Sequence, residues 1–108
     1  MIDKNNCIVP PNYLNKVVRT ISEERARKHF YYNEKAERCW FNKESCQDSK
    51  RSITKKVLGV DLKILAVGLD SVKVRYNLER KGHTFYIKLC EWAVDYVYDP
   101  KNDPEYYI

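Results

Sequence analysis

The sequence contains few of the residues on which catalytic and phosphate-binding motifs depend. Its 108 residues include only two histidines and three glycines. No glycine-rich phosphate loop and no nucleophile elbow occurs, so no catalytic residues can be assigned. We therefore expect a non-enzymatic protein that acts by binding.

Cysteine is also scarce. Cys7, Cys39, Cys46 and Cys90 are too few and too far apart to predict a disulfide framework. Together with His29, three of them could supply zinc ligands, but the six residues between Cys39 and Cys46 exceed the spacing of a zinc knuckle. Cys90 lies in an apolar strand pattern and is predicted to be a small buried hydrophobe. We expect four free thiols, no metal site and no cofactor.

Targeting and membrane signals are missing as well. The first residues, MIDKNNCIVPPNYL, lack the basic start and long apolar run of a signal peptide, and no apolar segment approaches membrane-spanning length. These features favour a cytoplasmic protein with no membrane contact. A chain of this length buries only about 65% of its unfolded surface, which favours a single domain over residues 1–108.

The charged residues are unevenly distributed. Residues 1–58 hold thirteen Lys and Arg against seven Asp and Glu, a net charge of +6. Residues 59–90 carry +3, and residues 91–108 carry −4. A basic body with an acidic tail favours an anionic partner such as nucleic acid.

The second half predicts a four-stranded antiparallel meander over residues 59–98. The expected strands are 60–68, 71–78, 83–90 and 92–98. In the second of these strands, the apolar and the polar side chains alternate, which places Lys73 and Arg75 on the face opposite Val72 and Val74. Strong twist would curl such a meander into a half-open sheet or a small SH3-like barrel.

The first half, residues 1–58, is ambiguous between helix and strand. Within residues 12–21, apolar positions fit a helical face and also fit an alternating strand. The run from Thr20 to Glu23 resembles a capping box, which predicts a helix through SEERARKHF. We predict one or two helices within 12–30, a hairpin with its turn at 33–36, and a polar loop over 42–54. The predicted fold class is α+β.

The run FYYNEKAERCWF is similar to the central hairpin of Kunitz-type protease inhibitors, which carries aromatic pairs, an Asn turn and a following Cys. The chain lacks that family's six-cysteine frame and its inhibitory-loop cysteine, and it continues into a meander that the family does not have. We interpret the likeness as convergent hairpin chemistry.

Cations and aromatic rings interleave in the first half. Exposed rings can stack unpaired bases, at about 1–3 kcal/mol per base, while cations bind phosphates. The neighbours Trp40 and Phe41 cannot both point outward from a strand, so at least half of these rings belong to the core. The leading prediction is a protein that binds RNA or single-stranded DNA. The predicted nucleic-acid-binding residues are Arg25, Arg27, Lys28, Tyr31, Tyr32, Lys50, Arg51, Lys55 and Lys56.

The acidic tail, residues 99–108, ends in Tyr106, Tyr107 and Ile108. Two prolines in it exclude a central strand, and its apolar end predicts docking, either on the basic first half of the chain or on a partner protein. These three residues are the predicted partner-binding residues. The alternative function is accordingly a protein-binding inhibitor or regulator, for example one encoded by a mobile element to block a host nucleic-acid enzyme.

Overall fold

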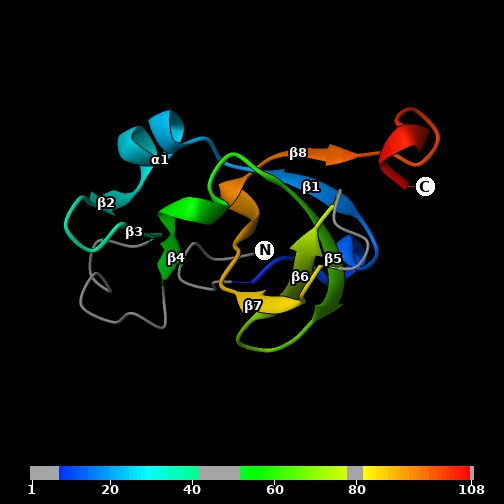
Figure 1. Cartoon of the computed structure of the whole chain (residues 1–108), viewed down its shortest axis with the longest axis horizontal. Coiled ribbons are helices and arrows are strands. Elements are labelled where there is room, and N and C mark those ends of the chain that lie inside the picture. The colour runs from blue at the N-terminus through cyan, green and yellow to red at the C-terminus, as the bar shows by residue number, and fades with distance from the viewer. Residues whose placement is uncertain (1–7, 42–51, 78–81, 108) are drawn as a thin grey trace.

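The computed structural model describes residues 8–41, 52–77 and 82–107. These residues form one α-helix and two antiparallel sheets, one of five strands and one of three (Figure 1). None of the described helices is long and apolar enough to cross a membrane.

The larger sheet has the strand order β7-β6-β5-β1-β8. Its strands are β1 (Val17–Thr20), β5 (Asp61–Val67), β6 (Val72–Tyr76), β7 (Phe85–Ile87) and β8 (Val94–Tyr98). The predicted meander is confirmed for β5, β6 and β7. It is wrong for the fourth strand, because β8 pairs with β1 at the opposite side of the sheet (Figure 1).

The route between β7 and β8 explains this difference. Leu89, Cys90 and Ala93 are fully buried, so the chain passes through the core before a 3-10 turn, η5 (Glu91–Ala93), leads it into β8. As a result, β7 and β8 are the two ends of the strand order. Among the described residues no closed barrel forms, and the predicted SH3-like closure is not found.

Residues 17–20 form a central strand, not the predicted helix. Val17 and Val18 are both fully buried, because β1 is flanked by strands on both sides and covered on both faces. Where consecutive residues are both buried, the sequence shows neither the 3.6-residue period of a helix nor the two-residue period of a strand clearly. The strand alternative for this segment is the correct one.

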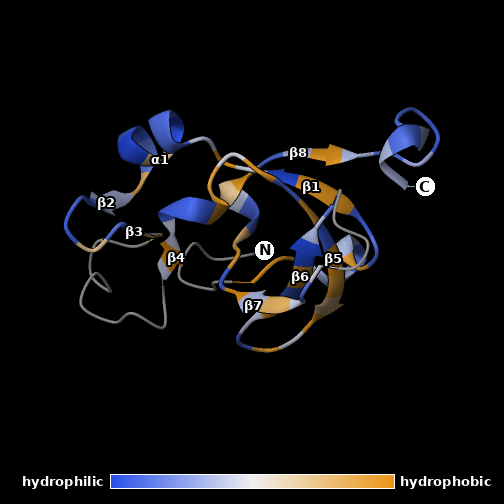
Figure 2. Cartoon of the chain, in the orientation of Figure 1, coloured by the Kyte–Doolittle hydropathy of each residue, from blue (hydrophilic) through white to orange (hydrophobic). Residues whose placement is uncertain are grey.

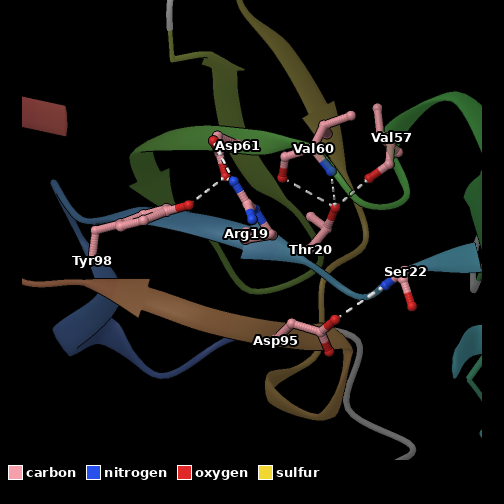
Figure 3. Close-up of polar contacts among 8 residues, drawn as sticks. All are labelled: Arg19, Thr20, Ser22, Val57, Val60, Asp61, Asp95 and Tyr98. Atoms are coloured by element: carbon pink, nitrogen blue, oxygen red, sulfur yellow. Dashed lines mark hydrogen bonds and ion pairs between the residues drawn. The ribbon is translucent and has the colours of Figure 1, made fainter.

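Thr20 belongs to β1 and does not cap a helix. Its hydroxyl donates a hydrogen bond to the Val57 carbonyl oxygen at 2.7 Å and accepts one from the Val60 amide at 3.0 Å (Figure 3). The helix α1 (Glu23–His29) begins later, with Ser22 as its N-cap accepting from the Arg25 amide. Acidic residues fill the first turn of α1 and basic residues its last turn, as the helix dipole favours.

The smaller sheet has the order β2-β3-β4, with β2 (Tyr31–Asn33), β3 (Arg38–Trp40) and β4 (Ser52–Thr54). The predicted hairpin is confirmed, and its turn is held by a hydrogen bond from the Ala36 amide to Asn33 Oδ1. The predicted loop over 42–54 is wrong at residues 52–54, which form β4; residues 42–51 lie outside the described residues. A three-residue strand is too short to show a periodic pattern.

The two sheets share one hydrophobic core. It includes Cys39 and Ile53 from the smaller sheet and Leu62, Ile64 and Val74 from the larger one. Hydrophobic residues occur along β1 and β5, whereas α1 is hydrophilic along most of its length (Figure 2). Both Trp40 and Phe41 are buried, because β3 ends at Trp40 and the chain bends at Phe41.

Candidate functional site

Carboxylates neutralise most of the described cations on the predicted nucleic-acid surface. The ion pairs are Arg25–Asp95, Arg27–Glu23, Arg27–Glu34, Lys28–Glu24 and Lys55–Glu23. The hydrogen bonds that Arg27 donates to Glu34 and Glu23 raise the pKa of Arg27, and the same contacts lower the pKa of both carboxyl groups. A phosphate would have to compete with these carboxylates.

Asp95 connects this surface to the larger sheet. It lies on β8, pairs with Arg25 and also accepts a hydrogen bond from the Ser22 amide at 3.3 Å (Figure 3). The ion pair between Arg25 and Asp95 joins residues 70 positions apart in the sequence. Arg25 therefore has a structural role at the start of α1.

The two tyrosines of the predicted surface differ in accessibility. Tyr31 is 38% exposed and packs edge-on against Trp40. Tyr32 is half-buried, and the Arg27 guanidinium lies 4.1 Å from its ring centroid. Tyr31 is therefore the more accessible of the two rings. Lys50 and Arg51 lie outside the described residues.

A second basic surface lies on the outer face of the larger sheet. The register pairs Lys63 with Arg75 and Lys73 with Tyr86, which places these side chains on one face. Val72 and Val74 point to the core, as predicted. We call Lys63, Lys73, Arg75 and Tyr86 the basic sheet face. Within the part of the chain that the structure describes, none of its three cations forms an ion pair with a carboxylate.

The centre of the basic sheet face is a like-charged pair. Lys63 and Arg75 lie directly opposite each other on adjacent strands, an arrangement that is destabilising. Desolvation lowers the pKa of Lys63, and the positive charge of Arg75 lowers it further. An anion between the two side chains would favour the charged form of Lys63 and offset both effects. Tyr86, 67% exposed, presents its ring beside these cations.

A cluster of polar side chains, in which a cation and a carboxylate neutralise each other, lies at the edge of the basic sheet face. Arg19 donates to Asp61 through Nε and Nη2, at 3.0 and 3.2 Å, and the Tyr98 hydroxyl donates to Asp61 at 3.1 Å (Figure 3). Burial raises the pKa of Tyr98, and its hydrogen bonds raise it further. The Asp61 carboxylate is therefore already paired with Arg19 and Tyr98.

The acidic tail docks within the chain. The Tyr107 hydroxyl accepts a hydrogen bond from the Val17 amide at 2.9 Å and donates one to the Tyr98 carbonyl at 2.5 Å, so it bridges β1 and β8. The Tyr106 ring stacks on Tyr98 with the centroids 3.9 Å apart. Lys63 Nζ lies 5.0 Å from the centre of the Tyr107 ring, which places the tail at one margin of the basic sheet face. Ile108 lies outside the described residues.

A groove of about 660 Å³ opens between the edge strands of the two sheets, β4 and β7. The described residues that line it include three cations, Arg38, Lys56 and Lys88, and no carboxylate. Arg38 is held by a hydrogen bond to Ser52 Oγ at 3.0 Å, and Lys88 donates to the Asp70 carbonyl oxygen. Of the predicted nucleic-acid-binding residues that the structure describes, only Lys56 lines this groove.

Side chains that could bind a metal ion are not clustered in the described residues. No group of three or more His, Cys, Asp or Glu side chains that could hold a metal ion occurs there. Cys39 and Cys90 are buried thiols that form no disulfide, and desolvation raises the pKa of Cys39 to about 12, which makes it a poor nucleophile. Cys7 and Cys46 lie outside the described residues.

The sequence placed Lys73 and Arg75 on one face of a strand, but the residues of the basic sheet face were not among the predicted binding residues. The available signal was their alternation with Val72 and Val74. The position of Lys63 opposite Arg75 depends on strand register, which the sequence does not specify directly.

No protein family, curated protein or solved structure matches this chain, so any functional conclusion depends on the residues and their geometry.

Proposed function

We propose that the protein binds single-stranded nucleic acid, RNA or DNA, on the basic sheet face and catalyses no reaction. The observation that carries this proposal is the Lys63–Arg75 pair. Two cations lie directly opposite each other with no described carboxylate to neutralise them, and an exposed tyrosine lies on the same face.

The chemistry of the two partners is complementary. Lys63, Lys73 and Arg75 would each contact phosphate oxygens, and binding would release the counterions condensed on the strand. The Tyr86 ring would stack on a base, a contact that tolerates any base because every base has a π-face. A phosphate between Lys63 and Arg75 would also relieve their mutual repulsion.

A salt-dependent titration tests the proposal. A fluorescein-labelled 12-nucleotide oligouridine or oligothymidine is titrated with protein at several NaCl concentrations, and its anisotropy is measured. The variant Lys63→Gln/Lys73→Gln/Arg75→Gln should bind more weakly. Its slope of log K against log salt should be shallower by about 2, because each phosphate contact on a single strand contributes about 0.7.

The matched control removes three charges from the surface predicted by sequence, in Arg25→Gln/Arg27→Gln/Lys28→Gln. Both variants have the same net charge, so a general electrostatic effect would weaken binding equally. We expect the control to keep most of the affinity and the slope of the native protein. Absence of binding by the native protein at low salt, or an equal loss in both variants, would contradict the proposal.

A second candidate function is binding to a partner protein as a regulator or inhibitor. It is favoured by Trp92 and Tyr96, which are 51% and 49% exposed near and within β8. Trp and Tyr are enriched among the residues that dominate protein interfaces. Trp92→Ala separates the two functions, because it should leave oligonucleotide affinity unchanged under the first and abolish partner binding under the second.

A further inference from the structure

The groove between β4 and β7 differs from the flat basic sheet face in shape and lining. One wall is the edge of β4 with Ile53, and the other is the edge of β7 with Phe85 and Ile87. The Phe85 ring packs against Tyr76, with the centroids 5.2 Å apart and the planes inclined at 46°. The groove therefore combines apolar and aromatic walls with three cations.

We propose that this groove receives one unpaired base of the bound strand, with its flanking phosphates on Lys56 and Lys88. The inference rests on the proposed function and adds to it the place where one base binds and the side chain that recognises its edge. Charge complementarity favours this ligand, because the described lining residues carry cations and no carboxylate.

The groove is large enough for a base together with its sugar and phosphate. A volume of about 660 Å³ is typical of small-molecule sites, which bury most of the ligand against apolar and aromatic side chains. The bases of a duplex are stacked and paired inside the helix, so they cannot enter such a groove without being flipped out. A base in a single strand enters at a lower cost in free energy.

Arg38 supplies the polar recognition. One of its guanidinium nitrogens donates to Ser52, which fixes the side chain at the groove, and within the described residues it has no carboxylate partner. Its other N–H groups form a planar fork, which is suited to two acceptors on a base edge or a phosphate. Lys88 is fixed in a similar way by the Asp70 carbonyl.

The groove is continuous with the basic sheet face. Tyr86 belongs to both, since it pairs with Lys73 in the sheet register and also lines the groove. A strand that crosses Lys63, Arg75 and Lys73 would therefore reach the groove at the β7 edge. The sheet face would hold the phosphate backbone, and the groove would hold a base.

Three probes test this division of roles: a 12-nucleotide oligothymidine, the same oligonucleotide with every base removed, and a 12-base-pair duplex. The native protein should bind the oligothymidine more tightly than the abasic strand by about 5- to 150-fold, as expected for loss of base contacts. Arg38→Gln should remove most of this difference and leave the affinity for the abasic strand nearly unchanged. Lys63→Gln should weaken binding to both single strands by a similar factor.

If Arg38→Gln keeps the full preference of the native protein for oligothymidine over the abasic strand, the inference is overturned and the proposed function stands, because Tyr86 alone would then supply the base contact. Equal affinity of the native protein for oligothymidine and the abasic strand, or for oligothymidine and the duplex, would contradict both. If no probe binds at low salt, the proposed function fails as well. Circular dichroism checks the folding of each variant. Should Arg38→Gln fail to fold, Arg38→Lys keeps the charge but loses the fork, and it should reduce the preference for the base-containing strand.

Discussion

The two basic regions of this protein contain similar numbers of cations but differ in how these are neutralised. On α1, Arg25, Arg27 and Lys28 each pair with a carboxylate. On the basic sheet face, Lys63 and Arg75 lie opposite each other with no described carboxylate between them. Surface ion pairs of the first kind contribute little to stability, but they reduce the local positive potential.

The number of cations on a surface does not by itself indicate where an anion could bind. Two adjacent cations that repel each other and have no carboxylate partner are a stronger indication, because their repulsion opposes folding.

The largest expected effect concerns the core beneath both regions. Cys39 lies in β3 of the smaller sheet, which adjoins α1. Its pKa of about 12 reduces the thiolate fraction at pH 8 by about a thousandfold relative to a free thiol. Iodoacetamide should therefore label Cys39 very slowly in the native protein, as read by peptide mass spectrometry. Cys90, buried near the larger sheet, should be equally protected. Fast labelling of Cys39 alone would mean that the smaller sheet opens independently.

The same thiol gives a pH dependence with a defined sign. The pKa of Cys39 is raised on folding, so its contribution to stability is fully present below the ordinary thiol pKa of about 8.5 and is lost as the pH rises toward 12. Cys39→Ser is the control, because it lacks the thiol. The free energies of unfolding of the native protein and of this variant should differ less above about pH 9 than below it.

The second effect concerns the margin of the basic sheet face. Tyr107→Phe removes the hydroxyl that joins the Val17 amide to the Tyr98 carbonyl, so both backbone groups lose a partner. We expect the free energy of unfolding in urea to fall by about 1–3 kcal/mol. Tyr86→Phe, which alters a largely exposed tyrosine, is the matched control and should change it by less than about 0.5 kcal/mol. Equal values for both variants would contradict the bridging role of Tyr107.

The third prediction sets the two regions directly against each other. Arg75→Gln removes the like-charge repulsion with Lys63 and leaves the contact between Lys63 and the Tyr107 ring in place, so it should raise the free energy of unfolding by about 0.2–1 kcal/mol. Arg27→Gln removes an exposed ion pair and should lower it by up to about 1 kcal/mol. Thermal or urea unfolding at low salt measures both. Changes of the same sign would contradict the proposed difference between the two basic regions.

The smallest expected effect comes from removing acids near α1. Glu23→Gln/Glu34→Gln frees Arg27 from both partners and makes that surface more basic. If the sheet face is the interface, affinity for oligothymidine at physiological salt should change little, because exposed charges are screened over about 8 Å. A large gain in affinity would place α1 within the interface.

The sequence was informative where structure follows a short-range period. Alternation predicted β5, β6 and the outward direction of Lys73, and turn chemistry predicted the β2–β3 hairpin. Pairing between distant segments was not predictable, which explains the errors over β1 and β8. The same limitation applies to charge, since the Asp95 partner of Arg25 lies 70 positions away.

The central position of β1 has a consequence for the order of folding. This strand is near the N-terminus, yet its two neighbours are β5 and β8, and the latter comes near the end of the chain. During synthesis β1 has no strand partner until residues 61–67 emerge, and its second edge stays open until residues 94–98 follow. Pairings of such long sequence separation form slowly, because loop-closure entropy is lost before any contact compensates for it. The local β5–β6–β7 meander is thus the expected nucleus, and completion of the sheet by β8 the last step.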